Sequence, residues 1–416
     1  MSIWIGCVIL AAAAGTCLAV LAIVYRWWLR WGAARQSAEA YPILADWPCV
    51  DVVVPVYNEA AWIGEKLANL ARLRYPTERL RYWIVDGGSR DGTRAIVAAA
   101  IRNDPRFQLL SLGRADKTAQ LNLALSQARG PWVMVTDADA RLAPDTLLRL
   151  LAAAGAEPSI AVVGTTVTPR QAHPLESLHW RLVNRLLRWE SERGCAGIVT
   201  APCYVFRRAL LTALPADVVA DDIHVALLAA ATGQRVAVVE AQVAELRSPV
   251  TLRQLLRHKL RKADAYLREV VRFAPRVRGM TATARQVFLW RAALLVLAPP
   301  LSALAGVGVA GAAAAAGVAG VVLALVGLAT VTAAVGLGAA SARPPVLRYA
   351  ALGALLCGVL FLALLRLPFS HSQIADYRLR DITNSSWRYC VSVSHGRRRA
   401  FRGSPPLSRP CHKDGA

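Results

Sequence analysis

Acidic residues are scarce in this 416-residue chain, which has 27 aspartates and glutamates against 49 lysines and arginines and a net charge of +22. A basic excess of this size can indicate a nucleic-acid-binding protein. Here, however, the surplus is arginine dispersed through an alanine- and arginine-rich sequence, with clusters beside apolar segments. Attraction to membrane lipids and to a phosphorylated substrate explains that distribution, so we expect no nucleic-acid partner.

Several metal- and nucleotide-binding motifs are missing. The eight cysteines are scattered, with no C-x-x-C pair and no other metal-site spacing, which favours a reduced cytoplasmic domain. Neither G-x-G-x-x-G nor G-x-x-x-x-G-K-[ST] occurs where a predicted strand ends. Their absence there argues against dinucleotide-binding proteins and P-loop nucleotide hydrolases. The sequence contains no internal repeat.

Charge is absent from residues 3–24, a stretch long enough for one transmembrane helix. A cleaved signal peptide is the alternative, but no basic segment precedes the apolar run and YRWWLRWGAAR follows it. Cations directly after the span place that end in the cytoplasm, with Trp27, Trp28 and Trp31 at the membrane interface.

A second apolar region covers residues 286–367. It predicts two spans between Val287 and Ala340, broken near GVGVAGAAAAAG, and a third candidate from Tyr349 to Leu365. The small residues suit close helix packing.

The basic tail beyond this region favours the cytoplasm, whereas four spans would place it outside. The sequence therefore leaves open the number of C-terminal spans and the side of the tail. Residues 403–416 have the composition of a disordered segment.

Between the two apolar regions, short apolar runs alternate with helical patterns. This order predicts the α/β class, with a mostly parallel sheet flanked by helices and right-handed crossovers. The predicted strands are 51–57, 81–86, 107–112 and 132–137, and the helices are 59–73, 91–101, 117–128 and 143–154.

Polar residues follow each predicted strand: PVYNE, DGGSRDG, Lys117 and DADA in turn. Ligands of parallel sheets bind outside the carboxyl ends of the strands. One polar cluster would be ordinary turn chemistry, and DGGSRDG by itself reads equally well as a turn with Asp91 as helix N-cap. Four clusters on one edge indicate a site.

The D-x-D sequence of Asp137 and Asp139 follows a buried strand. Buried carboxylates are costly unless they are paired or bound to a cation. The pair is therefore either a solvated loop or a site for a hard divalent cation completed by substrate phosphates.

Asp221 and Asp222 begin an apolar helix. The helix dipole explains one acidic residue at this end, and a second could serve as a general base. His224, two residues later, is expected to be structural.

Residues 251–273 combine a leucine stripe with a strongly basic opposite face, which predicts an amphipathic helix lying on anionic lipid. That placement leaves room for one or two of its cations to contact a diphosphate.

Taken in order, seven segments resemble glycosyltransferase family 2, the membrane-anchored inverting transferases with a GT-A fold. Together they cover residues 50–265, and they are VVVPVYNEA, IVDGGSRDGT, ADKTAQLNLAL, VMVTDADA, PLESLHWRLVNRLLRWES, VADDIHVALLAAATGQRVAVV and VAELRSPVTLRQLLRHKLRK. Each segment is weak alone, but the ordered set is specific.

The resemblance implies a nucleotide-sugar donor, with a uridine nucleotide favoured over a guanosine nucleotide. It implies that Asp86 contacts the base, that Pro55, Tyr57 and Glu59 line the nucleotide pocket, and that Lys117 lies near the donor.

The same resemblance assigns Asp137 and Asp139 to the donor and to its metal ion, Mg²⁺ or Mn²⁺. It makes Asp222 the catalytic base of an inverting, single-displacement transfer. Lys117 and Arg261 would stabilise charge on the leaving diphosphate.

The chain departs from the family at Q-x-x-R-W, which in processive synthases helps to hold the acceptor and the diphosphate. Arg261 matches the arginine, but His258 replaces glutamine and Lys262 replaces tryptophan. Gly87 also stands where many relatives carry a second aspartate. The first departure favours a single transfer to a lipid-linked or other glycan acceptor at a membrane surface.

The predicted function is thus a metal-dependent membrane glycosyltransferase with its catalytic domain at the cytoplasmic face of the inner or plasma membrane. A processive polysaccharide synthase and a non-catalytic scaffold of the same fold are the alternatives. A sugar-nucleotide pyrophosphorylase shares the sheet pattern, but it would need a glycine-rich, basic loop after the first strand, which PVYNEA is not.

The predicted organisation follows the chain in six parts. They are a transmembrane helix (1–25), a linker (26–48), the GT-A domain (49–250), a basic interfacial segment (251–284), a region of two to three transmembrane helices (285–367) and a partly disordered tail (368–416).

Overall fold

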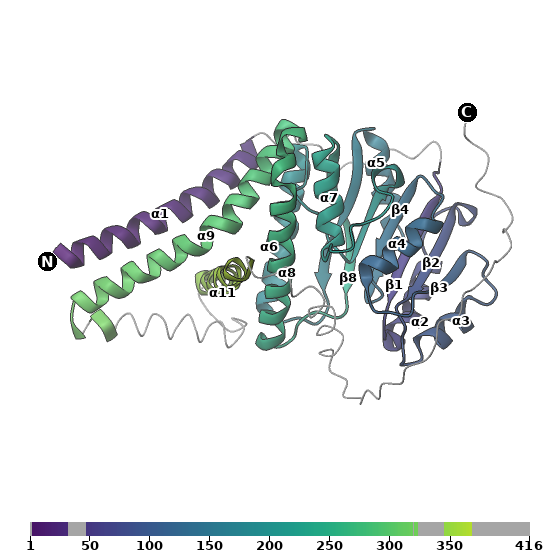
Figure 1. Ribbon diagram of the computed structural model, residues 1–416, viewed down its shortest axis with the longest axis horizontal. Helices are drawn as coiled ribbons and strands as arrows, with labels where there is room; N and C mark the ends of the chain where they lie inside the picture. Colours follow the sequence, from purple (N-terminus) through teal and green to yellow (C-terminus); the bar gives the residue numbers. More distant parts are fainter. Residues whose placement is uncertain (1, 32–46, 319, 323–344, 368–416) are drawn as a thin grey trace.

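The computed structural model describes residues 2–31, 47–318, 320–322 and 345–367. A sheet flanked by helices forms one end of the molecule, and two long helices, α1 and α9, project from the other end (Figure 1). Helices α6 and α8 lie between these two parts.

Eight strands form one mixed, mostly parallel sheet in the order β3-β2-β1-β4-β7-β6-β8-β5. The strands are β1 (Val50–Val56), β2 (Leu80–Asp86), β3 (Phe107–Ser111), β4 (Trp132–Thr136), β5 (Ala140–Leu142), β6 (Ile160–Pro169), β7 (Cys203–Arg207) and β8 (Arg235–Glu245). The helices are α1 (Ser2–Trp31), α2 (Ala60–Ala71), α3 (Thr93–Ile101), α4 (Lys117–Gln127), α5 (Thr146–Ala156), α6 (Pro174–Arg193), α7 (Asp221–Ala231), α8 (Leu252–Phe273), α9 (Ala282–Ala315) and α11 (Pro345–Arg366).

The first four strands are the four that the sequence predicts, and they pair in parallel. The second half of the sheet is different, because β7 runs antiparallel to both β4 and β6. Strands β5 to β8 do not alternate with helices as clearly along the sequence, so the sequence pattern does not predict them.

Both faces of the sheet are covered, which explains why its central strands are apolar throughout. Side chains alternate along a strand, so Val52 and Val54 of β1 enter one core with Ile63 and Leu70 of α2. Val53 points to the opposite core, formed with α4 and α7.

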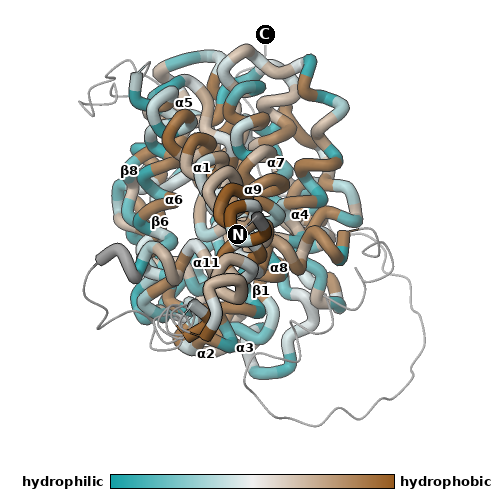
Figure 2. The backbone as a smooth tube through the Cα atoms, turned by 90° about the vertical axis from the view of Figure 1, so that its left-hand side faces the viewer, coloured by the Kyte–Doolittle hydropathy of each residue, from teal (hydrophilic) through white to brown (hydrophobic). Residues whose placement is uncertain are grey.

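Among the residues that the structure describes, three helices are long and apolar enough to cross a membrane: Ile3–Trp31, Ala282–Ala315 and Arg348–Arg366. Apolar residues dominate α1 and α9, which face the viewer in Figure 2. The two helices pack closely, because a Cβ atom at Gly308 would lie 2.6 Å from the backbone nitrogen of Ala11.

One predicted boundary changes and another is confirmed. Helix α1 continues to Trp31, so the linker cannot begin at residue 26. Helix α9 ends at Ala315, inside the sequence GVGVAGAAAAAG that was expected to interrupt it, and Gly317 follows with φ +78°. The second span predicted before Ala340, most of the linker, and the tail from residue 368 lie outside the described residues.

The predicted lipid-facing stripe of α8 is covered by protein. Leu255 and Leu267 of α8 are buried in a cluster with Leu175 of α6 and with Leu352 and Leu355 of α11. The expectation of a helix lying with its apolar face in lipid is therefore wrong for these leucines. The pattern was amphipathic, but only the folded chain reveals which surface covers it.

Candidate active site

The loop after β4 carries the D-x-D pair, and hydrogen bonds from a buried lysine hold this loop in place. The ammonium of Lys66, on α2, donates to Oγ1 of Thr136 at 2.7 Å and to the carbonyl of Ala140 at 2.9 Å. Burial lowers the pKa of Lys66 to about 7. Lys66 gave no signal in the sequence, because a lysine among the apolar positions of a helix resembles any surface lysine.

Lys117 joins the D-x-D pair to the second acidic pair. It is the first residue of α4, and its Nζ lies 3.0 Å from Oδ1 of Asp137 and 3.1 Å from Oδ1 of Asp221. Burial by itself would lower the pKa of this ammonium. The charges of Asp137, Asp221 and Asp222 raise the pKa by a larger amount, so the net shift is upward and Lys117 stays charged.

The two aspartates at the start of α7 differ in their surroundings. Asp221 is buried and accepts a hydrogen bond from the hydroxyl of Tyr204 at 2.7 Å, in addition to its contact with Lys117. Asp222 is half-buried. Burial and the charge of Asp221 raise the pKa of Asp222 to about 6, although Lys117 and Lys262 oppose the shift. A pKa near the working pH suits a general base.

Glu59 and Asp139 share one arginine. Arg247, which follows β8, donates from Nη2 to Oε1 of Glu59 and from Nε to Oδ2 of Asp139 at 3.3 Å. Burial raises the pKa of Glu59 to about 7. Burial and then the neighbouring charge of Asp137 raise the pKa of Asp139. Glu59 therefore lies beside the D-x-D pair, and Arg247 is a site residue that the motifs did not indicate.

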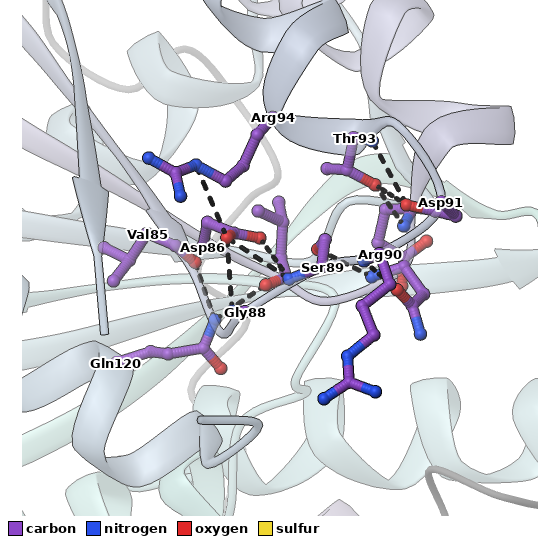
Figure 3. Close-up of polar contacts among 12 residues, drawn as sticks. Val85, Asp86, Gly88, Ser89, Arg90, Asp91, Thr93, Arg94 and Gln120 are labelled. Atoms are coloured by element: carbon purple, nitrogen blue, oxygen red, sulfur yellow. Dashed lines mark hydrogen bonds and ion pairs between the residues drawn. The ribbon is translucent and has the colours of Figure 1, made fainter. Parts of the chain in front are cut away.

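The loop after β2 is organised around Asp86 (Figure 3). The Asp86 carboxylate is fully buried and accepts from the backbone N–H groups of Gly88 and Ser89 at 3.1–3.2 Å, with Nε of Arg94 4.0 Å away. The Gln120 amide donates to the carbonyls of Val56 and Val85, which holds the ends of β1 and β2 together.

Two details of this loop depart from the simplest expectations. The residue before α3 is Gly92, so Asp91 is not the N-cap, and its carboxylate instead accepts from the backbone and hydroxyl of Thr93. At Gly87, a Cβ atom would lie 3.0 Å from the carbonyl oxygen of Arg114, which explains why glycine stands at this position.

The remaining predicted residues lie at the edges of this arrangement. Pro55 is half-buried at the end of β1, and Tyr57 is half-buried just after it. Arg261 is on α8, next to Lys262. The ammonium of Lys262 lowers the pKa of Asp222 and lies 5.2 Å from the ring centre of Trp180. His224 is structural, because its Nδ1 lies 2.8 Å from Oε2 of Glu269 and ties α7 to α8.

The charge of the site matches a cation bound together with an anion. Five carboxylates surround two basic groups, and these seven are Glu59, Asp137, Asp139, Asp221, Asp222, Lys117 and Arg247. One buried oxygen, Oε2 of Glu59, has no hydrogen-bond partner. Within the described residues no group of three or more acidic, histidine or cysteine side chains is arranged to hold a metal alone. Asp137 and Asp139 therefore fit a divalent cation whose remaining ligands come from phosphate and water.

Comparison with known proteins agrees with this arrangement. Residues 51–214 match the model of glycosyl transferase family 2, and this segment holds the loops after β1, β2 and β4. This segment of the chain belongs to glycosyl transferase family 2. This confirms the resemblance and the GT-A-type fold.

A solved structure extends the similarity over most of the chain. The mannosyltransferase PcManGT from Pyrobaculum calidifontis, solved with GDP-Man and Mn²⁺, is 26% identical, with a TM-score of 0.72, over 88% of this chain and 100% of that one.

Two curated relatives differ in how much of this chain they match. An N-acetylglucosaminyltransferase of Rhizobium meliloti (strain 1021) is 28% identical over 60% of this chain and 62% of its own length. A beta-monoglucosyldiacylglycerol synthase of Synechocystis sp. is 35% identical over 27% of this chain and 26% of its own length. The matches to the N-acetylglucosaminyltransferases span about three-fifths of those relatives.

Proposed function

We propose that this protein transfers a sugar from a nucleotide-diphosphate donor to a hydroxyl group of a membrane-bound acceptor, with inversion at the anomeric carbon. The observation that carries the proposal is the junction made by Lys117, which contacts the D-x-D aspartate Asp137 and the buried Asp221 next to Asp222. It brings a diphosphate-binding edge and a candidate base together.

The donor would lie along the carboxyl ends of β1, β2 and β4. Pro55 and Tyr57 would line the nucleotide pocket, and Asp86, whose two oxygens both accept hydrogen bonds from its own loop, would contact the base. Both nucleotide classes have support, because a bound GDP-sugar is named for the mannosyltransferase from Pyrobaculum calidifontis, whereas family resemblance favours uridine.

A divalent cation, Mg²⁺ or Mn²⁺, would be held by Asp139 and Asp137. It would supply positive charge against the diphosphate as the sugar leaves. Lys117 supplies fixed charge of the same sign, and Arg261 is the second cation that we assign to the diphosphate.

The transfer itself is a single displacement. Asp222 accepts the proton of the acceptor hydroxyl while the hydroxyl oxygen bonds to the anomeric carbon. The bond from that carbon to the donor phosphate breaks, and the nucleoside diphosphate departs with the electron pair. Asp221 stays bound to Tyr204 and Lys117, which fixes the first turn of α7 and thereby the position of Asp222.

A membrane acceptor suits the position of the site relative to the apolar helices. The base lies on α7, which packs on α8, and α8 in turn packs on the membrane-type helix α11. At the domain end of α1, Arg26 and Arg30 lie over the ring of Trp189, and we assign this basic end to the cytoplasmic face. A lipid-linked acceptor or a glycan at the membrane surface would reach the site from there.

The two alternatives make different demands. A processive synthase would need a surface that holds the growing chain, and Lys262, rather than an exposed tryptophan, stands next to the base. A scaffold would not need a half-buried carboxylate whose pKa is raised to about 6 beside an excess of acidic groups. Both observations favour the single-transfer enzyme.

The proposal is tested by nucleoside diphosphate release from the detergent-purified chain, with a panel of UDP- and GDP-sugars, Mn²⁺ or Mg²⁺, and a membrane lipid extract as acceptor source. We expect release from one donor, and loss of release with EDTA. Asp139→Asn should reduce release and weaken its dependence on metal concentration. Failure of every donor to bind at millimolar concentration would favour the scaffold instead, and long polymer made from donor alone would favour the synthase.

A further inference from the structure

Arg247 occupies a position that the proposed metal ion also requires. Its guanidinium lies between the carboxylates of Asp139 and Glu59, with Nε 3.3 Å from Oδ2 of Asp139. The backbone beside it is attached to the same loop, because the N–H of Leu246 donates to the carbonyl of Asp139 at 3.0 Å. Arg247 is thus placed by the end of β8, whose Glu245 pairs with Ala140 directly after the D-x-D pair.

The other nearby cation is already engaged. Lys117 contacts Asp137 and Asp221 rather than Asp139, so Arg247 is the basic group that balances Asp139. The carboxylate of Glu59 is only partly satisfied, since its second oxygen is buried without a hydrogen-bond partner. The Arg247 side chain as a whole is 48% exposed, so part of it faces solvent.

We propose that Arg247 is an internal counter-ion of Asp139, which a divalent cation must displace before Asp139 can bind that cation. This inference rests on the proposed function, because it takes Asp139 as a metal ligand. It assigns to Arg247 the control of metal affinity in the free protein.

The chemistry requires a physical displacement. An arginine stays protonated at any ordinary pH, so it cannot yield its place by losing charge. A cation and a guanidinium close to the same carboxylate oxygen repel each other. A guanidinium released from Asp139 keeps Glu59 as a partner and presents its remaining N–H groups to phosphate, for which its planar fork is suited. Metal should therefore bind weakly alone and more tightly when the donor diphosphate is present.

The test measures Mn²⁺ binding to the full detergent-purified chain, without donor, from the electron paramagnetic resonance signal of free Mn²⁺. Arg247→Gln should bind Mn²⁺ about fivefold more tightly than the original chain, the size expected for loss of one partly exposed ion pair. Arg247→Lys should fall between the two, because an ammonium is a point charge that cannot bridge two carboxylates in the same way. Arg188→Gln is the matched control, since it removes one positive charge at the exposed pair with Glu240.

A second measurement, the melting temperature Tm with and without Mn²⁺, separates metal binding from the stability of the variant itself. Ligand that binds the folded state raises the Tm by an amount that grows with affinity. Arg247→Gln should have a lower Tm than the original chain without metal, and Mn²⁺ should raise its Tm by more.

Three results separate the possibilities. Tighter Mn²⁺ binding in Arg247→Gln but not in Arg188→Gln supports the counter-ion. Unchanged or weaker binding in Arg247→Gln, with Asp139→Asn still abolishing binding, overturns the counter-ion and leaves the metal site intact. If Asp139→Asn also binds Mn²⁺ normally, the metal site of the proposed function fails, and the role of Arg247 fails with it.

Discussion

Two groups of buried and half-buried carboxylates in this protein differ in how fully their oxygens are paired with donors and cations. At the junction of the long helices with the domain, Glu190 of α6 is fully buried and accepts from Arg291 through both oxygens at 2.7 and 2.8 Å. It also accepts from the hydroxyl of Tyr25 and from the N–H of Gly197. At the strand ends, five carboxylates share two cations, and one oxygen of Glu59 has no partner.

The difference separates a structural ion pair from a binding site. The Glu190 cluster joins α1, α6 and α9 and needs no further ligand, so its energetic effect is on folding. In the strand-end cluster burial, and after it the negative charge of neighbouring aspartates, raises the pKa values of Glu59, Asp139 and Asp222. Groups with shifted pKa values gather at functional sites, where a bound substrate or metal ion changes their pKa values the most.

The largest expected effect comes from removing the carboxylate proposed as the base. Asp222→Asn should lower kcat by about 10²–10⁴-fold, the usual contribution of a general base, because the amide cannot accept the acceptor proton. Donor affinity, measured by titration calorimetry, should stay near that of the original chain. Transfer at an undiminished rate would exclude Asp222 as the base.

The next effect breaks the satisfied cluster. Glu190→Gln leaves Arg291 buried without its carboxylate and should reduce the free energy of unfolding by about 3–5 kcal/mol, measured by denaturant unfolding in detergent. Glu190→Met combined with Arg291→Met should recover much of that loss, because apolar side chains of similar volume replace a buried pair at little cost. A drop of this size in Asp222→Asn but not in Glu190→Gln would reverse the comparison between the two clusters.

A smaller effect concerns pH. Asp222 acts as a carboxylate, so kcat/KM should fall as pH decreases through its pKa of about 6, well above the range of an ordinary aspartate. Lys262 lowers this pKa, so Lys262→Gln should move the acidic limb of the profile to higher pH. Arg188→Gln is the control with the same charge change. An acidic limb that stays in place in Lys262→Gln would mean that another group governs it.

The smallest effect is expected at the surface. Arg188 and Glu240 form an exposed ion pair at 3.1 Å, with side chains 39% and 67% exposed. Arg188→Gln should change the free energy of unfolding by less than about 1 kcal/mol. A loss comparable to that of Glu190→Gln would show that burial is not what distinguishes the pairs.

Much of the parallel half of the sheet could be predicted, and much of the antiparallel half could not. Strands β1 to β4 alternate with helices, and each ends in a polar cluster that local sequence reveals. The pairing of β7 between β4 and β6 depends on contacts between distant segments. For the same reason the sequence does not indicate Arg247. Its position beside Asp139 follows from where β8 enters the sheet.

The sequence by itself determined the class of fold, the apolar helices and the acidic residues at the strand ends, because period and composition are local properties. Only the tertiary structure decided which charges meet. It placed Lys117 between Asp137 and Asp221, Arg247 on Asp139, and the leucine stripe of α8 against α11 rather than lipid. Electrostatic contacts and burial depend on distances in space, and residues more than a hundred positions apart acquire those distances only when the sheet is complete.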